Sequence, residues 1–294
     1  MKTAPHQDAA DLYREKITEE IFKALGLSAN SILRRGLEPV FRLPARRLGG
    51  IVARSDEDVR TSGLSGGCRR LLAEMSLRVS ARGAERIPKD GPLLILSNHP
   101  GAYDAAAIMA FVPRRDIKVI LSDVPFTRAI AACQDYFIYA PLNNAGRAAA
   151  LWTSMGHLQN GGSLLFFPHD EVEPDPESGS GAEATIQDWS HSIEIIMRRV
   201  PGIQVQVVIV GGILLPRFLR HPLAKVRKSA PQRQKLAEVL QIISQLAFRS
   251  ERPPLHLSFG APIEARSIPD GHGLAAVREA AAGLLEEHLV FFKG

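Results

Sequence analysis

The chain has little cysteine and no long apolar run. Two of its 294 residues are cysteine, Cys68 and Cys133. Two isolated thiols form neither a disulfide framework nor the paired spacing of a zinc site, so we expect free thiols in a reducing compartment. No uninterrupted run of about 18 apolar residues occurs, and the first eleven residues lack the apolar core of a secretion signal. We therefore expect a cytoplasmic protein, either free or peripheral on the inner membrane face.

Acidic residues are missing from two long stretches. Residues 27–54 contain six arginines and one acid, and the stretch 195–237 contains nine basic residues and no acid. Seven acids gather instead within 170–188. This segregation favours an anionic partner, such as an anionic membrane surface, a phosphate-bearing cofactor or an acidic carrier protein. A scattered solvated surface is the alternative. Aromatic residues make up only 6% of the chain and no recognition motif accompanies the charge, so nucleic acid is not an expected partner.

Residues 1–70 predict an N-terminal helical segment. Apolar positions recur at helical spacing within 11–25. Within 31–44 apolar residues alternate with arginines, which is typical of an interfacial helix. The alternative is a helix packed on the main domain with its arginines in water. The glycines at 49–50 and within 55–67 predict a flexible junction.

Residues 71–294 predict an α/β domain with a C-terminal helix. Apolar runs of strand length alternate with amphipathic stretches of helical length, which indicates a largely parallel central sheet of about seven strands flanked by helices. The expected strands are 77–81, 93–97, 117–122, 137–140, 163–167, 205–210 and 255–259. The expected helices are 105–112, 126–133, 145–160, 187–200, 230–249 and 273–291.

The most informative short segment runs from Asn98 to Asp104, between an expected strand and an expected helix. It places His99 and Asp104 on a strand-to-helix turn, where α/β proteins usually expose reactive groups. A neutral imidazole can accept a hydroxyl proton, and a carboxylate can orient the ring and balance its charge. The pair predicts chemistry on a hydroxyl without a metal or a covalent nucleophile. The structural alternative is a capping role for each residue.

Two other kinds of site are weaker. A metal site built from His99, Asp104, His169 and Asp170 matches no standard zinc spacing. Ser65 lies in a formal G-x-S-x-G match, Gly63 to Gly67, but no expected strand leads into it as a nucleophile elbow requires. Neither pattern is predicted to carry the chemistry.

Three features occur together: Asn98 before the histidine, the apolar strand before it, and the segment from Gly161 to Pro168 about sixty residues later. With these the chain resembles the glycerolipid acyltransferases of the lysophosphatidic acid acyltransferase type, whose first motif is NHxxxxD. The resemblance covers about residues 75–262. It implies transfer of a fatty acyl chain from acyl-CoA or acyl-carrier protein, as co-substrate, to a lipid hydroxyl, with no bound cofactor and no metal.

The resemblance also implies roles for single residues. His99 would be the general base and Asp104 its orienting partner. Backbone N–H groups at the Pro100–Gly101 turn could stabilise the oxyanion that forms in acyl transfer. The expected substrate contacts from matching positions are Asn98, Gly101, Phe167 and Pro168.

The chain departs from the family pattern where the family has arginines for the acceptor phosphate. The second motif ends in Ala140-Pro141 instead of an arginine, and Phe167-Pro168 is followed by His169-Asp170-Glu171 instead of Glu-Gly-Thr-Arg. The acceptor is therefore left open. Arg147 is a candidate substitute, with a solvated helix residue as the alternative. His169, Asp170 and Glu171 are candidates to hydrogen-bond a hydroxyl-rich or cationic acceptor, or else are loop residues.

The sequence as a whole predicts a peripheral O-acyltransferase. The N-terminal arginines would dock on anionic lipid, and the basic stretch 195–237 would meet the phosphates of CoA or the acidic surface of a carrier protein. Two alternatives remain: a lipid-binding protein of the same fold that has lost its chemistry, and an acyl-thioester hydrolase.

Overall fold

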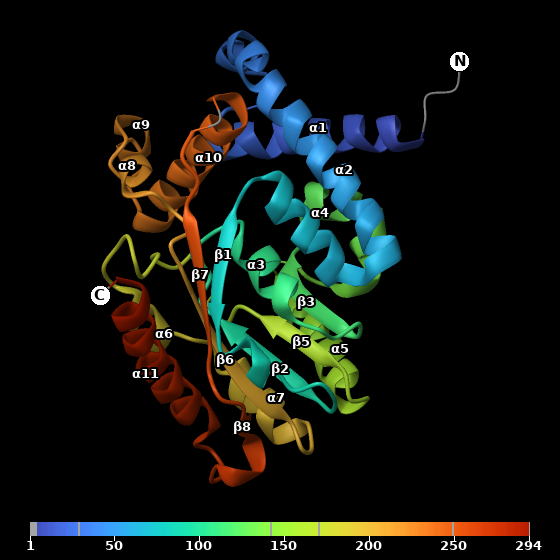
Figure 1. Cartoon of the computed structure of the whole chain (residues 1–294), viewed down its shortest axis with the longest axis vertical. Coiled ribbons are helices and arrows are strands. Elements are labelled where there is room, and N and C mark those ends of the chain that lie inside the picture. The colour runs from blue at the N-terminus through green and yellow to red at the C-terminus, as the bar shows by residue number, and fades with distance from the viewer. Residues whose placement is uncertain (1–4, 29, 142, 170, 249, 294) are drawn as a thin grey trace. The chain divides into compact units, whose positions relative to one another are not determined.

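A computed structural model describes residues 5–28, 30–141, 143–169, 171–248 and 250–293 (Figure 1). The chain divides into two compact units, each assembled from separate segments. The first comprises the chain up to Arg78 together with Val124–Gln134 and Leu214–Pro253, and the second comprises Val79–Asp123, Asp135–Ile213 and the chain from Pro254. Each unit has a buried apolar core of its own. The predicted division into 1–70 and 71–294 stays a prediction.

The second unit is built on an eight-stranded sheet with the order β1-β7-β6-β2-β5-β3-β4, and the short β8 pairs with β6. Strands β6, β2, β5, β3 and β4 run parallel, whereas β7 and β8 are antiparallel to β6. This confirms the predicted α/β class with a largely parallel central sheet. The strands are β1 (Arg78–Arg82), β2 (Leu93–Ser97), β3 (Ile117–Ser122), β4 (Phe137–Ala140), β5 (Ser163–Phe166), β6 (Gln204–Gly211), β7 (Pro254–Phe259) and β8 (Ile263–Glu264).

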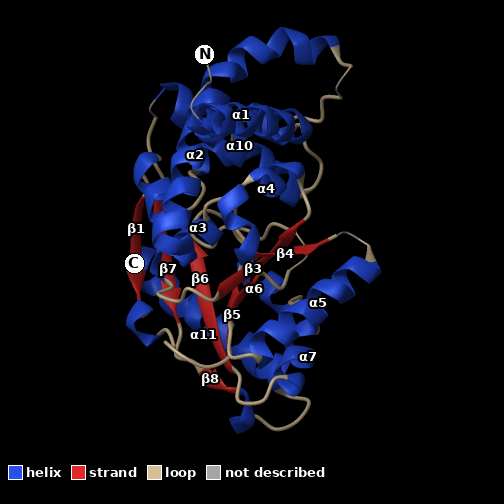
Figure 2. Ribbon diagram, turned by 90° about the vertical axis from the view of Figure 1, so that its right-hand side faces the viewer, coloured by secondary structure: helices blue, strands red, loops and turns tan. Residues whose placement is uncertain are grey.

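Helices cover both faces of this sheet (Figure 2). In β7, Ser258 hydrogen-bonds His288 of α11, whereas the ring of the next residue, Phe259, lies 6.4 Å from that of Phe111 in α3. Successive strand residues point to opposite faces, so α11 and α3 lie on opposite sides. Helices α5, α6, α7 and α11 share one apolar core with β2. The helices are α3 (Asp104–Phe111), α5 (Asn144–Gln159), α6 (Ala182–Gln187), α7 (Ser192–Arg199) and α11 (Gly273–Lys293), with 3₁₀ turns at Ala84–Arg86 and Ala265–Ser267.

The first unit is helical. Its core packs Tyr13 and Phe22 of α1 against Phe41 of α2. The Tyr13 hydroxyl donates to the buried carboxylate of Asp56 at 2.9 Å, and burial raises the pKa of the Tyr13 phenol. The helices are α1 (Pro5–Ala24), α2 (Ile32–Glu74), α4 (Pro125–Ala129), α8 (Pro216–Leu219), α9 (Pro222–Lys225) and α10 (Ala230–Phe248), and the 3₁₀ turn Ala131–Tyr136 follows α4. Among the described residues, none of the helices combines the length and apolar character needed to cross a bilayer.

The flexible junction predicted at 55–67 is wrong, because these residues are helical and belong to α2. The helix turns back on itself at Gly63, whose φ is 74°. Arg54 and Glu74 are 20 residues apart, about 30 Å along a straight helix, yet their side chains form an ion pair. At Gly67 an added Cβ would lie 2.7 Å from the Ser55 carbonyl oxygen. The glycines therefore permit close backbone approach instead of flexibility.

Most predicted elements are confirmed to within two residues. The helix expected at 187–200 is the shorter α7, and α6 ends where that helix was expected to begin. The helix expected at 126–133 is α4 followed by a 3₁₀ turn. The basic stretch 195–237 does not belong to one unit. Arg198 and Arg199 lie in the second unit, whereas the basic residues from Arg217 onward lie in the first.

Candidate active site

Asn98 fixes the start of the strand-to-helix turn. Its side-chain Nδ2 donates to the Val210 carbonyl and its Oδ1 accepts from the Val210 N–H, both at 2.8 Å. Strands β2 and β6 pair in parallel up to Ser97 and Val208, so the Asn98 amide continues the ladder past the end of β2. Asn98 is 3% exposed, and this geometry makes it an anchor for the turn. Its expected contact with substrate stays a prediction.

His99 and Asp104 are brought together as predicted. Nδ1 of His99 lies 2.7 Å from Oδ2 of Asp104, the first residue of α3. The Asp104 side chain is 1% exposed, whereas that of His99 is 34% exposed. A carboxylate has no proton to donate, so the imidazole holds its proton on Nδ1 and its lone pair on Nε2. This is the tautomer that a general base requires.

The Gly101 N–H does not serve as an open oxyanion donor. It donates to Oδ2 of Asp104 at 3.1 Å, the same oxygen that binds His99. The turn therefore orients Asp104 from its own backbone, and Asp104 in turn orients the imidazole. The Gly101 N–H is therefore engaged by the carboxylate in this structure, and its expected role toward an oxyanion stays a prediction.

The end of β5 lies beside the end of β2, because Leu96 pairs with Phe166. The Phe167 ring consequently packs on the His99 ring, with centroids 4.8 Å apart and planes inclined by 40°. The Pro168 carbonyl accepts from the Ser190 N–H at 3.0 Å. Two motifs about sixty residues apart in sequence thus meet at one edge of the sheet, as the resemblance implied.

Among the polar residues after Pro168, His169 and Glu171 contact each other. Nδ1 of His169 lies 2.9 Å from the Glu171 carbonyl oxygen and 3.2 Å from the Glu171 backbone nitrogen, and Glu171 is exposed. Asp170 lies outside the described residues. The local hydrogen bond supports the loop interpretation of His169 and Glu171, and their contact with an acceptor stays a prediction.

Arg147 is exposed in the first turn of α5, which follows β4. In the sheet order β2-β5-β3-β4, β4 is the third strand from β2. Three strand spacings separate the two backbones by about 14 Å. Its position after β4 does not by itself place it at the His99–Asp104 pair, and its expected role as a substitute for the missing arginines stays a prediction.

Glu173 is a site residue that the sequence did not single out. Its Oε2 accepts from the backbone N–H of His99 at 2.7 Å, and its own N–H donates to the His99 carbonyl at 2.8 Å. Its Oε1 accepts from Nε1 of the fully buried Trp189 at 3.0 Å. Burial raises the pKa of the Glu173 carboxyl, and its hydrogen bonds with Trp189 and His99 oppose that rise. The sequence feature that could have identified Glu173 is its place between Val172 and Pro174, five residues after Pro168 of the third motif.

A second polar cluster anchors the same loop. Glu177 accepts hydrogen bonds from Nδ1 of His256 at 2.9 Å and from Nε2 of His288 at 3.1 Å. Oδ1 of Asp175 accepts from the backbone N–H of Gly212 at 3.0 Å. Three acids of the 170–188 stretch, Glu173, Asp175 and Glu177, are therefore internal hydrogen-bond partners and not an open acidic surface. Within the described residues, no three His, Cys, Asp or Glu side chains are grouped as metal ligands.

No family model matches the chain, and no curated protein matches its sequence. The crystal structure of the 1-acyl-sn-glycerophosphate (LPA) acyltransferase PlsC from Thermotoga maritima is similar to this chain, with a TM-score of 0.51 and 18% sequence identity. The similarity covers 93% of this chain and 97% of that chain. At this identity the likeness establishes a shared fold over nearly the whole length of both chains.

Proposed function

We propose that the protein is an O-acyltransferase that moves a fatty acyl chain from an acyl-CoA or acyl-carrier-protein thioester to a lipid hydroxyl. The observation that carries this proposal is the 2.7 Å contact between Nδ1 of His99 and Oδ2 of Asp104, which leaves the lone pair on Nε2 of a partly exposed imidazole. The fold shared with an LPA acyltransferase supports it.

In the proposed reaction, Nε2 of His99 takes the proton of the acceptor hydroxyl while its oxygen attacks the thioester carbonyl carbon. The new C–O bond forms, the C–S bond breaks, and the leaving thiolate takes the proton from the imidazolium. Asp104 stabilises the imidazolium between these steps. The step balances with the thioester and the hydroxyl alone.

The acceptor is proposed to be lysophospholipid-like, with its phosphate bound differently from the family pattern. Ala140 and Pro141 stand where the family has an arginine, and a neutral residue cannot form the bidentate bond to phosphate. His169 and Glu171 contact each other and come shortly after Phe167, whose ring packs on His99. This position supports a role for the two residues in selecting the acceptor.

The proposed enzyme works at the inner membrane surface, docked through the first turns of α2. Four large apolar side chains there are exposed, and Ile32 is 85% exposed. They are interleaved with arginines on a helix that begins without an acid. Exposed apolar groups beside arginines favour an interfacial helix on anionic lipid. The apolar residues are Ile32, Leu33, Val40 and Leu43, and the arginines are Arg34, Arg35 and Arg42.

The test is thiol release from acyl-CoA and from acyl-carrier protein by the purified chain, with and without a panel of lysolipids. Release that requires a lysolipid, together with an acylated lipid product, supports transfer and names the donor and acceptor. Equal release in both cases would identify a hydrolase, and no release with any donor would identify a lipid-binding protein. His99→Ala, checked for an unchanged melting temperature, should abolish transfer.

A further inference from the structure

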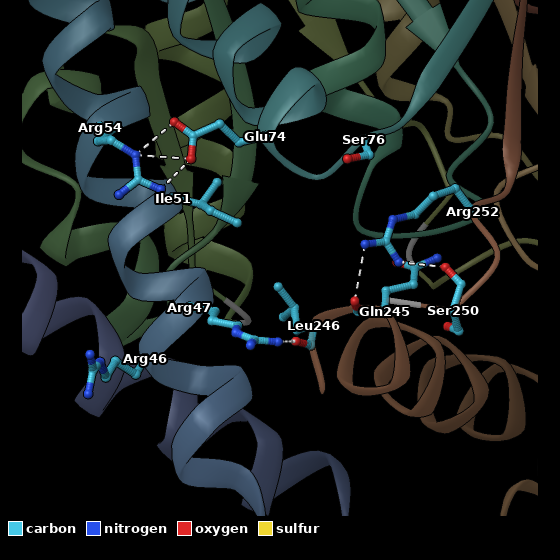
Figure 3. Close-up of a pocket in the computed structure, with 10 residues that line it drawn as sticks. All are labelled: Arg46, Arg47, Ile51, Arg54, Glu74, Ser76, Gln245, Leu246, Ser250 and Arg252. Atoms are coloured by element: carbon cyan, nitrogen blue, oxygen red, sulfur yellow. Dashed lines mark hydrogen bonds and ion pairs between the residues drawn. The ribbon is translucent and has the colours of Figure 1, made fainter. Parts of the chain in front are cut away.

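The first unit contains an arginine-lined cavity of about 690 Å³ between α2 and the end of α10 (Figure 3). Four arginines line it, Arg46, Arg47, Arg54 and Arg252, together with one acid, Glu74. Four positive charges and one negative charge give a net charge of 4 − 1 = +3. A concave surface with this charge concentrates the potential inside it and favours an anion.

Glu74 does not neutralise the remaining arginines, because it is already paired. Nε of Arg54 donates to its carboxylate at 2.7 Å, and Arg70 lies 3.1 Å from the same group. The hydrogen bond from Arg54 lowers the pKa of the Glu74 carboxyl. The charges of Arg46, Arg47 and Arg252 are therefore the surplus.

Two of these guanidinium groups are held in place by neutral backbone carbonyls. Arg47 donates to Leu246, and Arg252 donates to Met75 at 2.8 Å and to Gln245 at 3.1 Å. The bonds to Gln245 and Leu246 satisfy carbonyls in the last turn of α10, and the bond to Met75 satisfies the carbonyl of the residue that caps α2, which explains why arginines are present there. They leave the positive charges intact and fix their positions. Because these side chains are already held in place, binding an anion would cost the protein little additional side-chain entropy.

The backbone geometry at Ser76, on the cavity wall, does not explain why a serine is present there. Ser76 is the one non-glycine residue with positive φ in the described part of the chain, at 56°. Its N–H donates to the Ala73 carbonyl and the N–H of Leu77 donates to that of Leu72, both at 2.9 Å, which closes α2 in a Schellman motif. Glycine is the usual residue at that position because a Cβ is unfavourable there. A strained residue whose side chain faces a cavity indicates a functional hydroxyl.

We propose that this cavity binds the phosphate group of an organic phosphate, with the Arg47 and Arg252 guanidinium groups and the Ser76 hydroxyl as donors. Its volume exceeds that of a bare phosphate ion and falls within the range of small-molecule sites. The bound phosphate belongs either to an anionic phospholipid headgroup or to a soluble organic phosphate. The site is independent of the proposed acyl transfer, since it uses none of the His99 region.

The test uses two probes on the purified full chain. Adenosine 3′,5′-bisphosphate, measured by titration calorimetry, represents the soluble source. Phosphatidylcholine vesicles with or without phosphatidic acid, measured by co-sedimentation, represent the lipid source. Saturable binding of the bisphosphate identifies a soluble ligand, and binding that depends on phosphatidic acid and on Arg47 identifies a headgroup.

Four variants separate ligand binding from stability. Arg47→Gln should weaken binding about tenfold, because it removes a charged donor but can still cap Leu246. Ser76→Gly should weaken binding about threefold and yet raise the melting temperature by about 2 °C, because it relieves the positive φ. Glu74→Gln should tighten binding, since it raises the positive charge of the cavity. Arg69→Gln, an exposed arginine of the same helix outside both the cavity and the proposed docking residues, is the matched control and should bind like the parent chain.

The proposal is overturned if neither probe binds saturably to the parent chain. It is also overturned if Arg47→Gln and Ser76→Gly bind as tightly as Arg69→Gln. Because Ser76→Gly is expected to stabilise the fold, its loss of affinity cannot be attributed to unfolding.

Discussion

Glu173 holds the backbone of His99 from both sides: its N–H donates to the His99 carbonyl at 2.8 Å, and its Oε2 accepts from the His99 N–H at 2.7 Å. The two residues are 74 positions apart. Asp104 orients the imidazole, so the side chain and the main chain of His99 are each held by a different carboxylate. Removal of either carboxylate should therefore impair the same residue in a different way.

Glu173→Gln should lower kcat about 100-fold with little change in KM. The amide can offer one oxygen to Trp189 or to the His99 N–H but not to both, and its NH₂ then faces a donor. The free energy of unfolding should fall by about 1–3 kcal/mol. Steady-state kinetics and urea unfolding measure both effects. Glu183→Gln, an exposed acid ten residues later, is the control. Full kcat in a folded Glu173→Gln chain would show that the backbone clamp is unnecessary.

Stability should depend on pH through Glu173. Because burial raises its pKa, the folded chain binds a proton at a higher pH than the unfolded chain does. This contribution to stability is complete below the ordinary carboxyl pKa and is lost as pH rises through the raised pKa. Urea midpoints measured from acid to neutral pH should show this loss. The corresponding component should be absent in Glu173→Gln, and an identical pH dependence in the two proteins would argue against it.

Asp104→Asn should reduce kcat by a factor of about 100 to 10,000. If the introduced side-chain amide donates to Nδ1, the imidazole carries its proton on Nε2 and cannot accept one from the hydroxyl. The melting temperature distinguishes this loss from unfolding, because the amide oxygen then takes the place of Oδ1 and can still accept from the Ala105 N–H. A folded variant that keeps most of its kcat would mean that Asp104 serves only as a helix cap.

Val40→Ser should weaken binding to anionic vesicles, and high salt should weaken the binding of the parent chain. The side chain is 61% exposed on α2 among arginines, so it is available to insert into lipid while the arginines meet the headgroups. Salt shortens the screening length from about 8 Å at physiological strength to about 3 Å at 1 M. Val290→Ser, on α11 and 76% exposed, is the matched control. Vesicle co-sedimentation that is equal for the two variants would place the contact elsewhere.

Much of the second unit could be predicted because its signals are local. The buried strands are continuous apolar runs, as expected for a parallel sheet covered on both faces. His99 and Asp104 are five residues apart, so a single turn between β2 and α3 brings them into contact. The motif at Phe167 could be associated with that turn by resemblance, and parallel pairing of β2 with β5 supplies the physical reason.

The glycines at 55–67 show where a local signal was misleading. Glycine weakens an isolated helix, so the sequence predicted a flexible junction. The structure uses Gly63 for a sharp reversal and Gly67 for a close approach to Ser55. Composition alone does not show whether a glycine makes the backbone flexible or allows another part of the chain to pack closely against it.

The sequence by itself determined the α/β class, the strands and the His99–Asp104 pair, because each depends on residues near one another in the chain. Only the tertiary structure decided how the acidic stretch is used. Glu173 reaches His99 across 74 residues, and Glu177 reaches His288 across 111. Acids that look like a solvated loop become buried acceptors once backbone N–H groups after β2 and β6 and the His256 ring of β7 present donors to them, because a buried carboxylate persists only where N–H groups compensate for the lost water.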